Sequence, residues 1–402
     1  TSPPAQSGQF NVVLTGFTHK TAKNTLPFVC CFAKDNARRG SSSPSFNLVE
    51  TPARYTEGSD AMGDLHYAQY ECATSATDAY RYVFFARECS TELSRGVEIE
   101  YVEVPGDAAA ADSEVSLAVC HPYVYGYVPP EQLVEWFEFQ QLVGISRFHA
   151  FYNKKHIDPR VMAVLRYYQG QGLATLKEVT LPSVQSNSLL YLFLEYKCLY
   201  PGGVMRDVSS LTVNALPFES HQFWMDMFIM YNECRVRLAS FTYVLDTDLD
   251  ELLVPQLPYN TLNDALKDAS AAFPDVAYFD VHSYTHVKDW GTSYSDTNLF
   301  FLRYLNQTAD NHLWSPPLPK KSSPKVIYRP SRVRRPRIHD AVVLSPYKKY
   351  PMPEKYALFH HYRACKPFLG GSDCSTLDRY PATDVLRFQA AWEEAMEEKK
   401  GR

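Results

Sequence analysis

The first 110 residues alternate short apolar runs with clusters of Ser, Gly, Pro and Asp. β-Branched and aromatic residues are frequent in these runs, and each run is short enough to be a single strand. Several short strands at this spacing are typical of a small sandwich or barrel. We therefore predict a small all-β, sandwich-like domain over residues 1–110, with strands at 10–15, 28–32, 80–85 and 97–104.

The pattern changes after a small-residue stretch at 105–112, which we interpret as a linker. Segments with apolar residues at helical spacing now alternate with compact apolar runs. Pro129 and Pro130 can open the first helix, Gly144 can end it, and Asp158 can cap the second. The order strand, helix, strand, helix, strand predicts a mostly parallel sheet with helices on both faces. The expected strands are 115–120, 145–152 and 173–179, and the expected helices are 129–144 and 158–168.

Downstream, a helical stretch at 221–239 leads into an apolar strand that begins at Thr242. A helix opened by Thr261 and a strand at 276–281 follow. We expect a proline-rich, basic loop region at 313–350 and a final helix at 383–400. These elements predict an α/β domain over 113–365 and a C-terminal tail with a helix over 366–402.

The strand at 242–255 runs into alternating carboxylates at Asp246, Asp248 and Asp250. On an extended strand these three side chains would share one face and could converge on a hard cation. A calcium loop is excluded, because Glu251 stands where such a loop needs glycine and Leu257 where it needs a bidentate glutamate. A strand-end Asp-x-Asp in an α/β chain is typical of nucleotide-sugar transferases that hold Mn²⁺ or Mg²⁺. A solvated acidic turn is the alternative.

Two other groups could serve the same site. His360 and His361 follow an apolar run, and one imidazole could join the carboxylates as a metal ligand. A core histidine beside a surface histidine is the alternative. Lys325 and Arg329, from a basic segment at 320–337, could contact phosphate or an acidic acceptor, although most charges of that segment fit a solvated loop.

Direct displacement at a sugar carbon needs a group that takes the proton of the acceptor hydroxyl. Asp280 and Asp289 are the candidate bases, and His339 and Asp340 are further polar residues that a mechanism could use. The sequence does not choose among them.

Composition narrows the function classes. The chain has 402 residues, 45% of them hydrophobic and 14% aromatic, which suffices for two domains with sizeable cores. Its formal net charge of −5 gives no basic field, so nucleic acid and anionic membranes are poor partners. A polar, neutral substrate fits better. No G-x-S-x-G elbow, P-loop or G-x-G-x-x-G is present, so hydrolase, kinase and dinucleotide-binding signatures are missing.

The nine cysteines lack the paired C-x-x-C motifs of a structural zinc site. In an oxidising compartment Cys72 could pair with Cys89, and Cys365 with Cys374. Asn306 begins a glycosylation sequon, which we expect in a loop. The chain starts at Thr1 and has no run of about 18 apolar residues, so we expect a lumenal fragment of a membrane protein whose anchor lies outside this sequence.

Short motifs follow one another in order over about residues 115–365. They are Cys120-His121-Pro122-Tyr123, Glu135-Trp136-Phe137-Glu138-Phe139, Leu142-Val143-Gly144-Ile145, Tyr231-Asn232-Glu233-Cys234, Asp248-Leu249-Asp250-Glu251, Val254-Pro255, Lys325, Arg329-Pro330, His339 and His361-Tyr362-Arg363. The ordered set resembles glycosyltransferase family 92, formerly the domain of unknown function 23. Glu233 and Leu252 depart from the family pattern, which usually has Asp and an aromatic residue there.

The resemblance implies a GT-A type, Rossmann-like domain that binds a nucleotide sugar, with a metal-dependent, inverting transfer of galactose from UDP-galactose into a β-linkage. It implies Asp248 and Asp250 as the metal-binding pair for Mn²⁺ or Mg²⁺ and His361 as the third ligand. Cys120, His121 and Pro122 would lie near the uridine, and Lys325, Arg329 and Arg363 are the candidate diphosphate contacts.

Family members extend β-1,4-galactan or galactosylate the core fucose of N-glycans, so the implied partners are a UDP-sugar donor and a glycan acceptor. The expected location is the Golgi lumen, as a type II membrane protein, with a homodimer left open. The N-terminal β-domain could resemble the carbohydrate-binding domain of plant members. The alternatives are a non-catalytic carbohydrate-binding protein with a degenerate transferase domain and a metal-dependent hydrolase.

Overall fold

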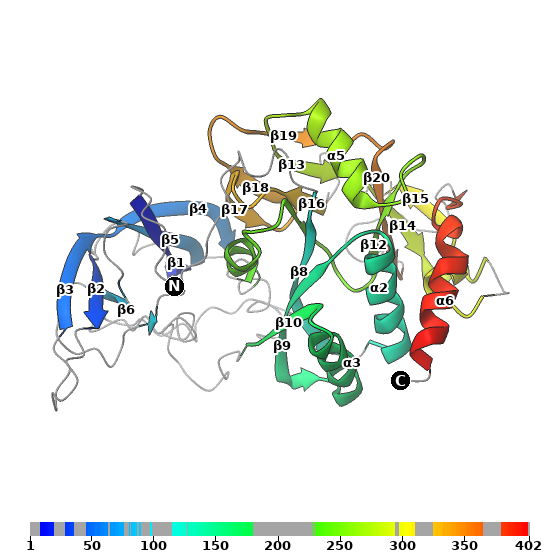
Figure 1. Ribbon diagram of the computed structural model, residues 1–402, viewed down its shortest axis with the longest axis horizontal. Coiled ribbons are helices and arrows are strands. Elements are labelled where there is room, and N and C mark those ends of the chain that lie inside the picture. Colours follow the sequence, from blue (N-terminus) through cyan, green and yellow to red (C-terminus); the bar gives the residue numbers. More distant parts are fainter. Residues whose placement is uncertain are drawn as a thin grey trace. The chain divides into compact units, whose positions relative to one another are not determined.

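The computed structural model describes residues 9–19, 29–35, 46–62, 65–75, 80, 82–86, 88–89, 97–98, 115–126, 128–179, 227, 230–293, 297–309, 325–364 and 379–400. The chain divides into two compact units, one made of 1–101 and 180–229 and the other of 102–179 and 230–402 (Figure 1). The predicted linker at 105–112 and residues 221–226 of the predicted helix lie outside the described residues.

The first unit contains two antiparallel sheets. One has the order β1-β5-β4, and the other has the order β3-β2-β6-β7. Their strands are β1 Gln9–His19, β2 Val29–Asp35, β3 Phe46–Pro52, β4 Arg54–Met62, β5 Leu65–Ser75, β6 Tyr82–Ala86 and β7 Val97–Glu98. The expectation of an all-β segment is therefore confirmed for the part of it that the structure describes.

Two disulfides hold this unit together. Cys30 and Cys31 are consecutive on β2, so their side chains leave opposite faces of the strand. Cys30 bonds Cys72 of β5 and thereby joins the two sheets, while Cys31 bonds Cys89. The predicted pairing of Cys72 with Cys89 is therefore wrong. Cys365 and Cys374 lie outside the described residues.

The main sheet of the second unit has seven strands in the order β10-β9-β8-β11-β16-β13-β19. The predicted β-α-β-α-β segment is confirmed, and its three strands pair in parallel with one another and with β11. The sheet as a whole is mixed, because β16 runs antiparallel to both β11 and β13. The strands are β8 Leu117–Gly126, β9 Arg147–Ile157, β10 Ala174–Glu178, β11 Tyr243–Asp246, β13 Val276–Val281, β16 Lys325–Tyr328 and β19 Lys348–Pro351.

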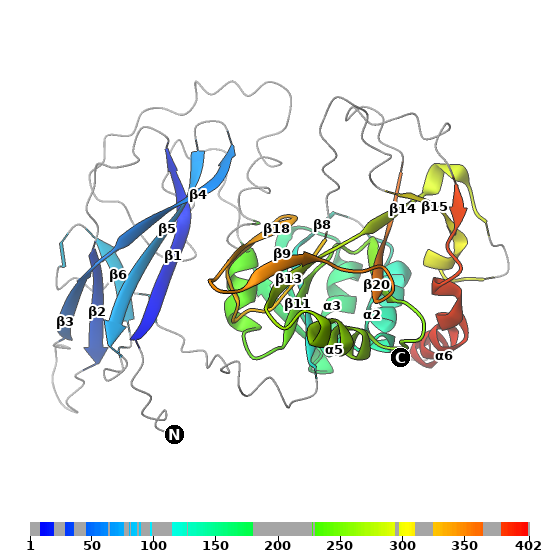
Figure 2. The ribbon, with the colours of Figure 1, turned by 90° about the horizontal axis from the view of Figure 1, so that it is seen from above.

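Helices cover this sheet and begin where the capping residues predict. They are α2 Pro130–Leu142, α3 Pro159–Gly170 and α5 Leu262–Ala272, and residues 230–237 are also helical. The carboxylate of Asp158 accepts a hydrogen bond from the backbone of Arg160 at 2.8 Å, and Thr261 caps α5. Helix α5 runs beside β13 (Figures 1 and 2). Gly144 follows α2 with a positive φ of 101°, and a Cβ there would collide with the side chain of Asn263.

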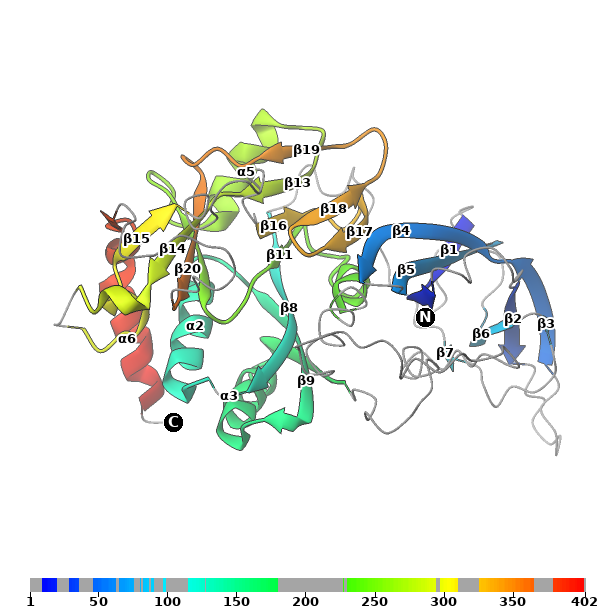
Figure 3. The same cartoon turned by 180° about the vertical axis from the view of Figure 1, so that it is seen from behind.

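A second sheet of five strands has the order β12-β20-β14-β15-β21. Its strands are β12 Glu251–Pro255, β14 Ser283–Val287, β15 Asn306–Ala309, β20 Ala357–Arg363 and β21 Tyr380–Pro381. Asn306 is the first residue of β15, so the sequon does not begin in a loop as predicted. The expected loop region at 313–350 in fact contains β16, β19 and the hairpin of β17 Val333–Arg337 and β18 Asp340–Val343, which lies next to β16 (Figure 3).

The C-terminal segment packs onto this unit. It contains a 3₁₀ turn, η10 Val385–Phe388, and the helix α6 Gln389–Lys400, which lies alongside α2 (Figures 1 and 3). The indole of Trp392 is buried and donates to the backbone oxygen of Glu135 at 3.0 Å. Residues 379–400 therefore form part of the second unit, where the sequence suggested a tail. None of the helices in the described part of the chain is long and apolar enough to span a membrane.

Candidate functional site

The acidic motif lies in the turn that joins the seven-stranded sheet to the five-stranded sheet. Strand β11 ends at Asp246, residues 247–250 turn, and β12 starts at Glu251. The backbone N–H of Glu251 donates to the carbonyl of Asp248 at 3.2 Å, and the backbone N–H of Asp248 donates to the Glu251 carboxylate at 2.9 Å. The prediction of a continuous strand through the motif is therefore wrong. Strand alternation does not apply to this turn, so it does not place the three aspartates on one face.

Asp246 is separated from the other two carboxylates by its environment. It is 2% exposed, and the hydroxyl of the buried Tyr231 donates a hydrogen bond to it. Burial raises the pKa of Asp246 to about 7. Asp248 and Asp250 have side chains that are 44% and 39% exposed, so these two can meet a ligand from solution.

The pairing of β12 with β20 brings His361 to the turn. Glu251 and His361 are register partners, and the N–H of Tyr362 donates to the carbonyl of Asp250 at 2.8 Å. The Nε2 atom of His361 lies 3.5 Å from the Asp250 carboxylate, and its Nδ1 atom lies 3.5 Å from Glu251. The structure thus brings Asp248, Asp250 and His361, the three predicted metal ligands, into one cluster.

Lys325, the first residue of β16, completes the cluster. Its buried ammonium lies 2.9 Å from the Asp248 carboxylate and 2.8 Å from the Glu251 carboxylate. Burial alone would lower its pKa, but the carboxylates outweigh that effect and raise it well above the usual value. Burial likewise raises the pKa of Asp248, and the charge of Lys325 reverses this and lowers it. Lys325 was predicted to contact a diphosphate, and in the structure its ammonium is paired with two carboxylates.

The donor set fits a divalent cation chemically. Carboxylate oxygens and imidazole are ligands that Mn²⁺ accepts. Ionised Asp248, Asp250 and Glu251 together with the Lys325 ammonium leave two negative charges, which a divalent ion would balance. Among the described residues, however, no three His, Cys, Asp or Glu side chains form a ready metal cage, so the ligands would have to move toward an ion.

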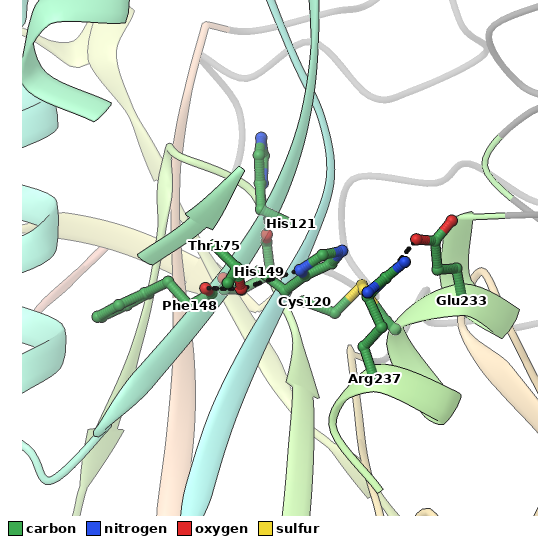
Figure 4. The surroundings of a disulfide bond; sticks show 9 residues. Cys120, His121, Phe148, His149, Thr175, Glu233 and Arg237 are labelled. Carbon is green, nitrogen blue, oxygen red and sulfur yellow. Dashed lines mark hydrogen bonds and ion pairs between the residues drawn. A yellow bond between two sulfur atoms is a disulfide. The ribbon is translucent and has the colours of Figure 1, made fainter. Parts of the chain in front are cut away.

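The segment Cys120-His121-Pro122 lies within β8, which continues six residues beyond Cys120 to Gly126. Cys120 and His121 point to opposite sides (Figure 4). Cys120 forms a disulfide with Cys234 and thereby ties β8 to the helix at 230–237. The Nδ1 atom of His121 lies 2.9 Å from the carbonyl oxygen of Thr247, so His121 reaches the acidic turn.

Two predicted residues lie away from the cluster. Arg329 follows the far end of β16, four residues and about 13 Å from Lys325, and its guanidinium lies over the ring of Tyr243 at 5.2 Å. Asp280 alternates with Val281, the register partner of Lys325, and so faces the other side of the sheet. Its carboxylate is 3.6 Å from the ammonium of Lys349, and burial raises its pKa.

Four candidates remain. Arg363 and Asp289 lie at one end of the five-stranded sheet, and His339 and Asp340 lie in the β17–β18 hairpin. Arg363 ends β20 two residues after His361, on the same face, and pairs with Val287 of β14. Asp289 follows in the short turn after Val287 and is exposed, so it lies at that same end of the sheet. His339 takes a positive φ of 64° in the β17–β18 turn, and Asp340 accepts the hydroxyl of Tyr278 at 2.5 Å.

The profile of glycosyltransferase family 92 matches residues 115–400, which is most of the chain and all of the second unit's described elements. The chain belongs to glycosyltransferase family 92. Membership implies that it acts on a sugar donor and an acceptor. The match includes α6, in agreement with the packing of that helix against α2.

A second comparison finds a similarity over a shorter stretch. The β-1,4-galactosyltransferase galt-1 of Caenorhabditis elegans is 25% identical over 107 residues, which cover 24% of this chain and 25% of that protein. The alignment thus spans about a quarter of each protein. Because the alignment is partial, the galactosyltransferase activity of that relative is only a hypothesis for this chain.

Two features of this family 92 chain escaped sequence reasoning. Glu251 contributes a buried carboxylate to the cluster, although its place in the Asp-x-Asp-Glu motif was an available signal. Glu233, the departure from the family pattern, binds Lys177 at 2.7 Å and Arg237 at 2.5 Å, so it fastens the helix at 230–237 to β10.

Beyond these two residues, a third missed feature lies behind His361. His360 is fully buried, and its Nε2 atom is 3.0 Å from the carboxylate of Asp384. Its Nδ1 atom is 2.9 Å from Nε2 of His286, whose Nδ1 atom contacts the carbonyl oxygen of Tyr304. Burial lowers the pKa of His286 well below its usual value. We call these three side chains, His286, His360 and Asp384, the histidine network.

The disulfides give information about the compartment. Three are present among the described residues, and they join strands and a helix in both units. Such bonds are typical of oxidising environments such as the lumen of the secretory pathway.

Proposed function

We propose that this protein transfers galactose from UDP-galactose to a glycan acceptor in a β-linkage, with inversion, on a GT-A type domain in the Golgi lumen. The observation that carries the proposal is the convergence of Asp248, Asp250 and His361 at the turn between the two sheets. Their arrangement supports a site for Mn²⁺ or Mg²⁺ beside a nucleotide diphosphate. The likeness to galt-1 supports galactose as the transferred sugar.

In this proposal, Asp248, Asp250 and His361 hold the cation, which supplies positive charge to the departing diphosphate. Arg363 is on the same face as His361 and can add a second positive charge to the diphosphate. His121 contacts the carbonyl oxygen of Thr247 from β8, which supports its proposed place near the uridine. Asp289 is the candidate base for the acceptor hydroxyl, because it lies at the same end of the sheet as Arg363.

A donor and acceptor screen tests the proposal. The purified chain is incubated with Mn²⁺ and, in turn, UDP-galactose, UDP-glucose and UDP-N-acetylglucosamine. Each donor is combined with core-fucosylated N-glycans or β-1,4-galacto-oligosaccharides, and products are measured by mass spectrometry. We expect a mass increase of one hexose with UDP-galactose only, and none for Asp250→Ala.

The other outcomes are equally informative. Transfer from UDP-glucose alone would overturn the donor assignment and keep the transferase. Release of free galactose without elongation would favour a hydrolase. Glycan binding in calorimetry without any UDP binding would favour the non-catalytic carbohydrate-binding protein.

A further inference from the structure

We infer that Glu251 is a positioning residue of the cation site: it holds His361 and the acidic turn in place and is not itself a ligand. The inference rests on the proposed function, since it concerns how the ligands of that site are held. It arises from the location of the Glu251 carboxylate, which lies at the centre of the cluster and is 1% exposed.

One oxygen of Glu251 is committed to the turn. Its Oε2 atom accepts the backbone N–H of Asp248 at 2.9 Å and lies 2.8 Å from the ammonium of Lys325. Two donors of this kind satisfy the oxygen and fix the path of the chain between Asp248 and Glu251. A change at Glu251 would therefore move Asp248 through its backbone as well as through Lys325.

The other oxygen of Glu251 faces the imidazole. Its Oε1 atom is 3.5 Å from Nδ1 of His361, while Nε2 of the same ring is 3.5 Å from Asp250. A carboxylate beside one nitrogen of a metal-ligand histidine helps to fix the orientation of the ring. Glu251 thus directs Nε2 of His361 to the side where Asp250 lies.

The backbone of Glu251 is held from the opposite side. Its carbonyl oxygen accepts the indole N–H of Trp136 at 2.9 Å and the amide of Gln140 at 3.4 Å, both from α2. The backbone N–H of Tyr362, the residue after His361, donates to the carbonyl oxygen of Asp250 at 2.8 Å. With main chain and side chain both fixed, Glu251 cannot reach toward solvent as Asp248 and Asp250 do, which is why it positions ligands and does not bind the ion.

The test measures Mn²⁺ affinity, from the electron paramagnetic resonance signal of free Mn²⁺ in the presence of UDP, with no turnover. Glu251→Gln keeps the size of the side chain and removes its charge, and we expect binding to weaken about 10- to 100-fold, the usual effect of losing such a partner. Glu138→Gln is the matched control. Glu138 is also a buried carboxylate, but it binds Tyr168 at 2.6 Å, away from the cluster, so Mn²⁺ affinity should stay within about twofold of the unsubstituted chain.

A second variant separates positioning from simple charge pairing with Lys325. Lys325→Met alone is the reference, because it removes the ammonium that is also paired with Asp248. If Glu251 served only to neutralise the ammonium, the double substitution Glu251→Gln with Lys325→Met would bind Mn²⁺ as tightly as Lys325→Met. We expect the double variant to bind more weakly, because His361 has still lost its partner. The double variant also removes the buried, half-paired lysine, so it covers the case in which Glu251→Gln alone fails to fold.

The outcomes distinguish the inference from the proposed function. If the unsubstituted chain binds Mn²⁺, Asp250→Ala abolishes binding and Glu251→Gln leaves it unchanged, the inference is overturned and the proposed function stands. Equal affinity in the double variant and in Lys325→Met likewise overturns the inference. If the unsubstituted chain binds no Mn²⁺ at all, the proposed cation site itself is overturned.

Discussion

The two faces of β20 each carry a histidine, and these two histidines have different roles. His360 and His361 are consecutive, so their side chains leave opposite faces of the strand. His360 is fully buried between Asp384 and His286, with both ring nitrogens in hydrogen bonds. The side chain of His361 is 17% exposed and faces Asp250 and Glu251 across 3.5 Å.

The difference lies in how charge is distributed. In the histidine network all four ring nitrogens have a close, fixed partner, and a carboxylate lies beside one end of the chain of contacts, so the network needs nothing from solution. At the acidic turn three carboxylates share one ammonium and two of them are partly exposed, so negative charge remains for a ligand. A polar cluster on a strand therefore indicates a binding site when its charges are incomplete, and a structural role when they are complete.

The largest expected effect is loss of transfer at the acidic turn. Asp250→Ala should lower the transfer rate at least about 10³-fold, because the cation's contribution of several kcal/mol depends on its ligands. Asp280→Asn is the matched control: it removes a carboxylate from the other face of the main sheet and should keep activity within about twofold. Equal losses in both variants would contradict the placement of the site.

The next prediction compares the replacement of each of the two histidines by alanine. His360→Ala leaves the buried imidazole of His286 and the part-buried carboxylate of Asp384 without their shared partner, at an expected cost of about 3–5 kcal/mol and a fall in Tm of about 5–15 °C. His361→Ala should leave Tm within about 2 °C and reduce transfer strongly, since its side chain is partly exposed and belongs to the site. Differential scanning fluorimetry beside the transfer assay decides the matter, and the comparison fails if both variants show the same pattern.

The smallest expected effect is on the pH dependence of stability, and it comes from the buried carboxyl group of Glu135. Glu135 is 4% exposed and accepts the backbone N–H of Phe300 at 2.6 Å. Burial raises its pKa from 4.5 to about 8. Between those values the folded state binds more protons than the unfolded state, so stability from this group is present below pH 4.5 and is lost as pH rises to 8. The slope is at most about 1.4 kcal/mol per pH unit.

Glu135→Gln should therefore remove this part of the pH dependence. Relative to the unsubstituted chain, the variant should gain stability as the pH rises from 5 to 8, which chemical denaturation at several pH values can measure. A constant difference between the two proteins across that range would show that Glu135 does not hold its proton in the folded state.

Local features were predictable from the sequence. Asp158 and Thr261 cap α3 and α5 because capping depends on a few neighbouring residues. The β-α-β-α-β segment followed from its apolar periodicity. The antiparallel direction of β16 was missed, because it depends on pairing with β11 and β13, which are 40 or more residues away in the chain.

The site was predictable in its members more than in its geometry. Ligand chemistry predicted a cation site at the aspartates of the motif with one of the two adjacent histidines, and the family resemblance selected Asp248, Asp250 and His361. The register of β12 with β20 brings these residues together. Arg329 was predicted with Lys325 from the basic segment at 320–337 and the family motif, but on a strand four residues span about 13 Å. The disulfides could not be assigned from nine cysteines, since connectivity depends on which strands are neighbours.

Lys325 gives the fold a counter-ion of its own. Because its ammonium already draws Asp248 and Glu251 together, the turn can close as the chain folds, before any metal arrives. At the proposed cation site, loading with a divalent ion would then be an exchange, in which Lys325 would release Asp248 and keep its contact with Glu251. A preparation stripped by a chelator should accordingly be inactive yet native, and should regain its activity when the ion is returned.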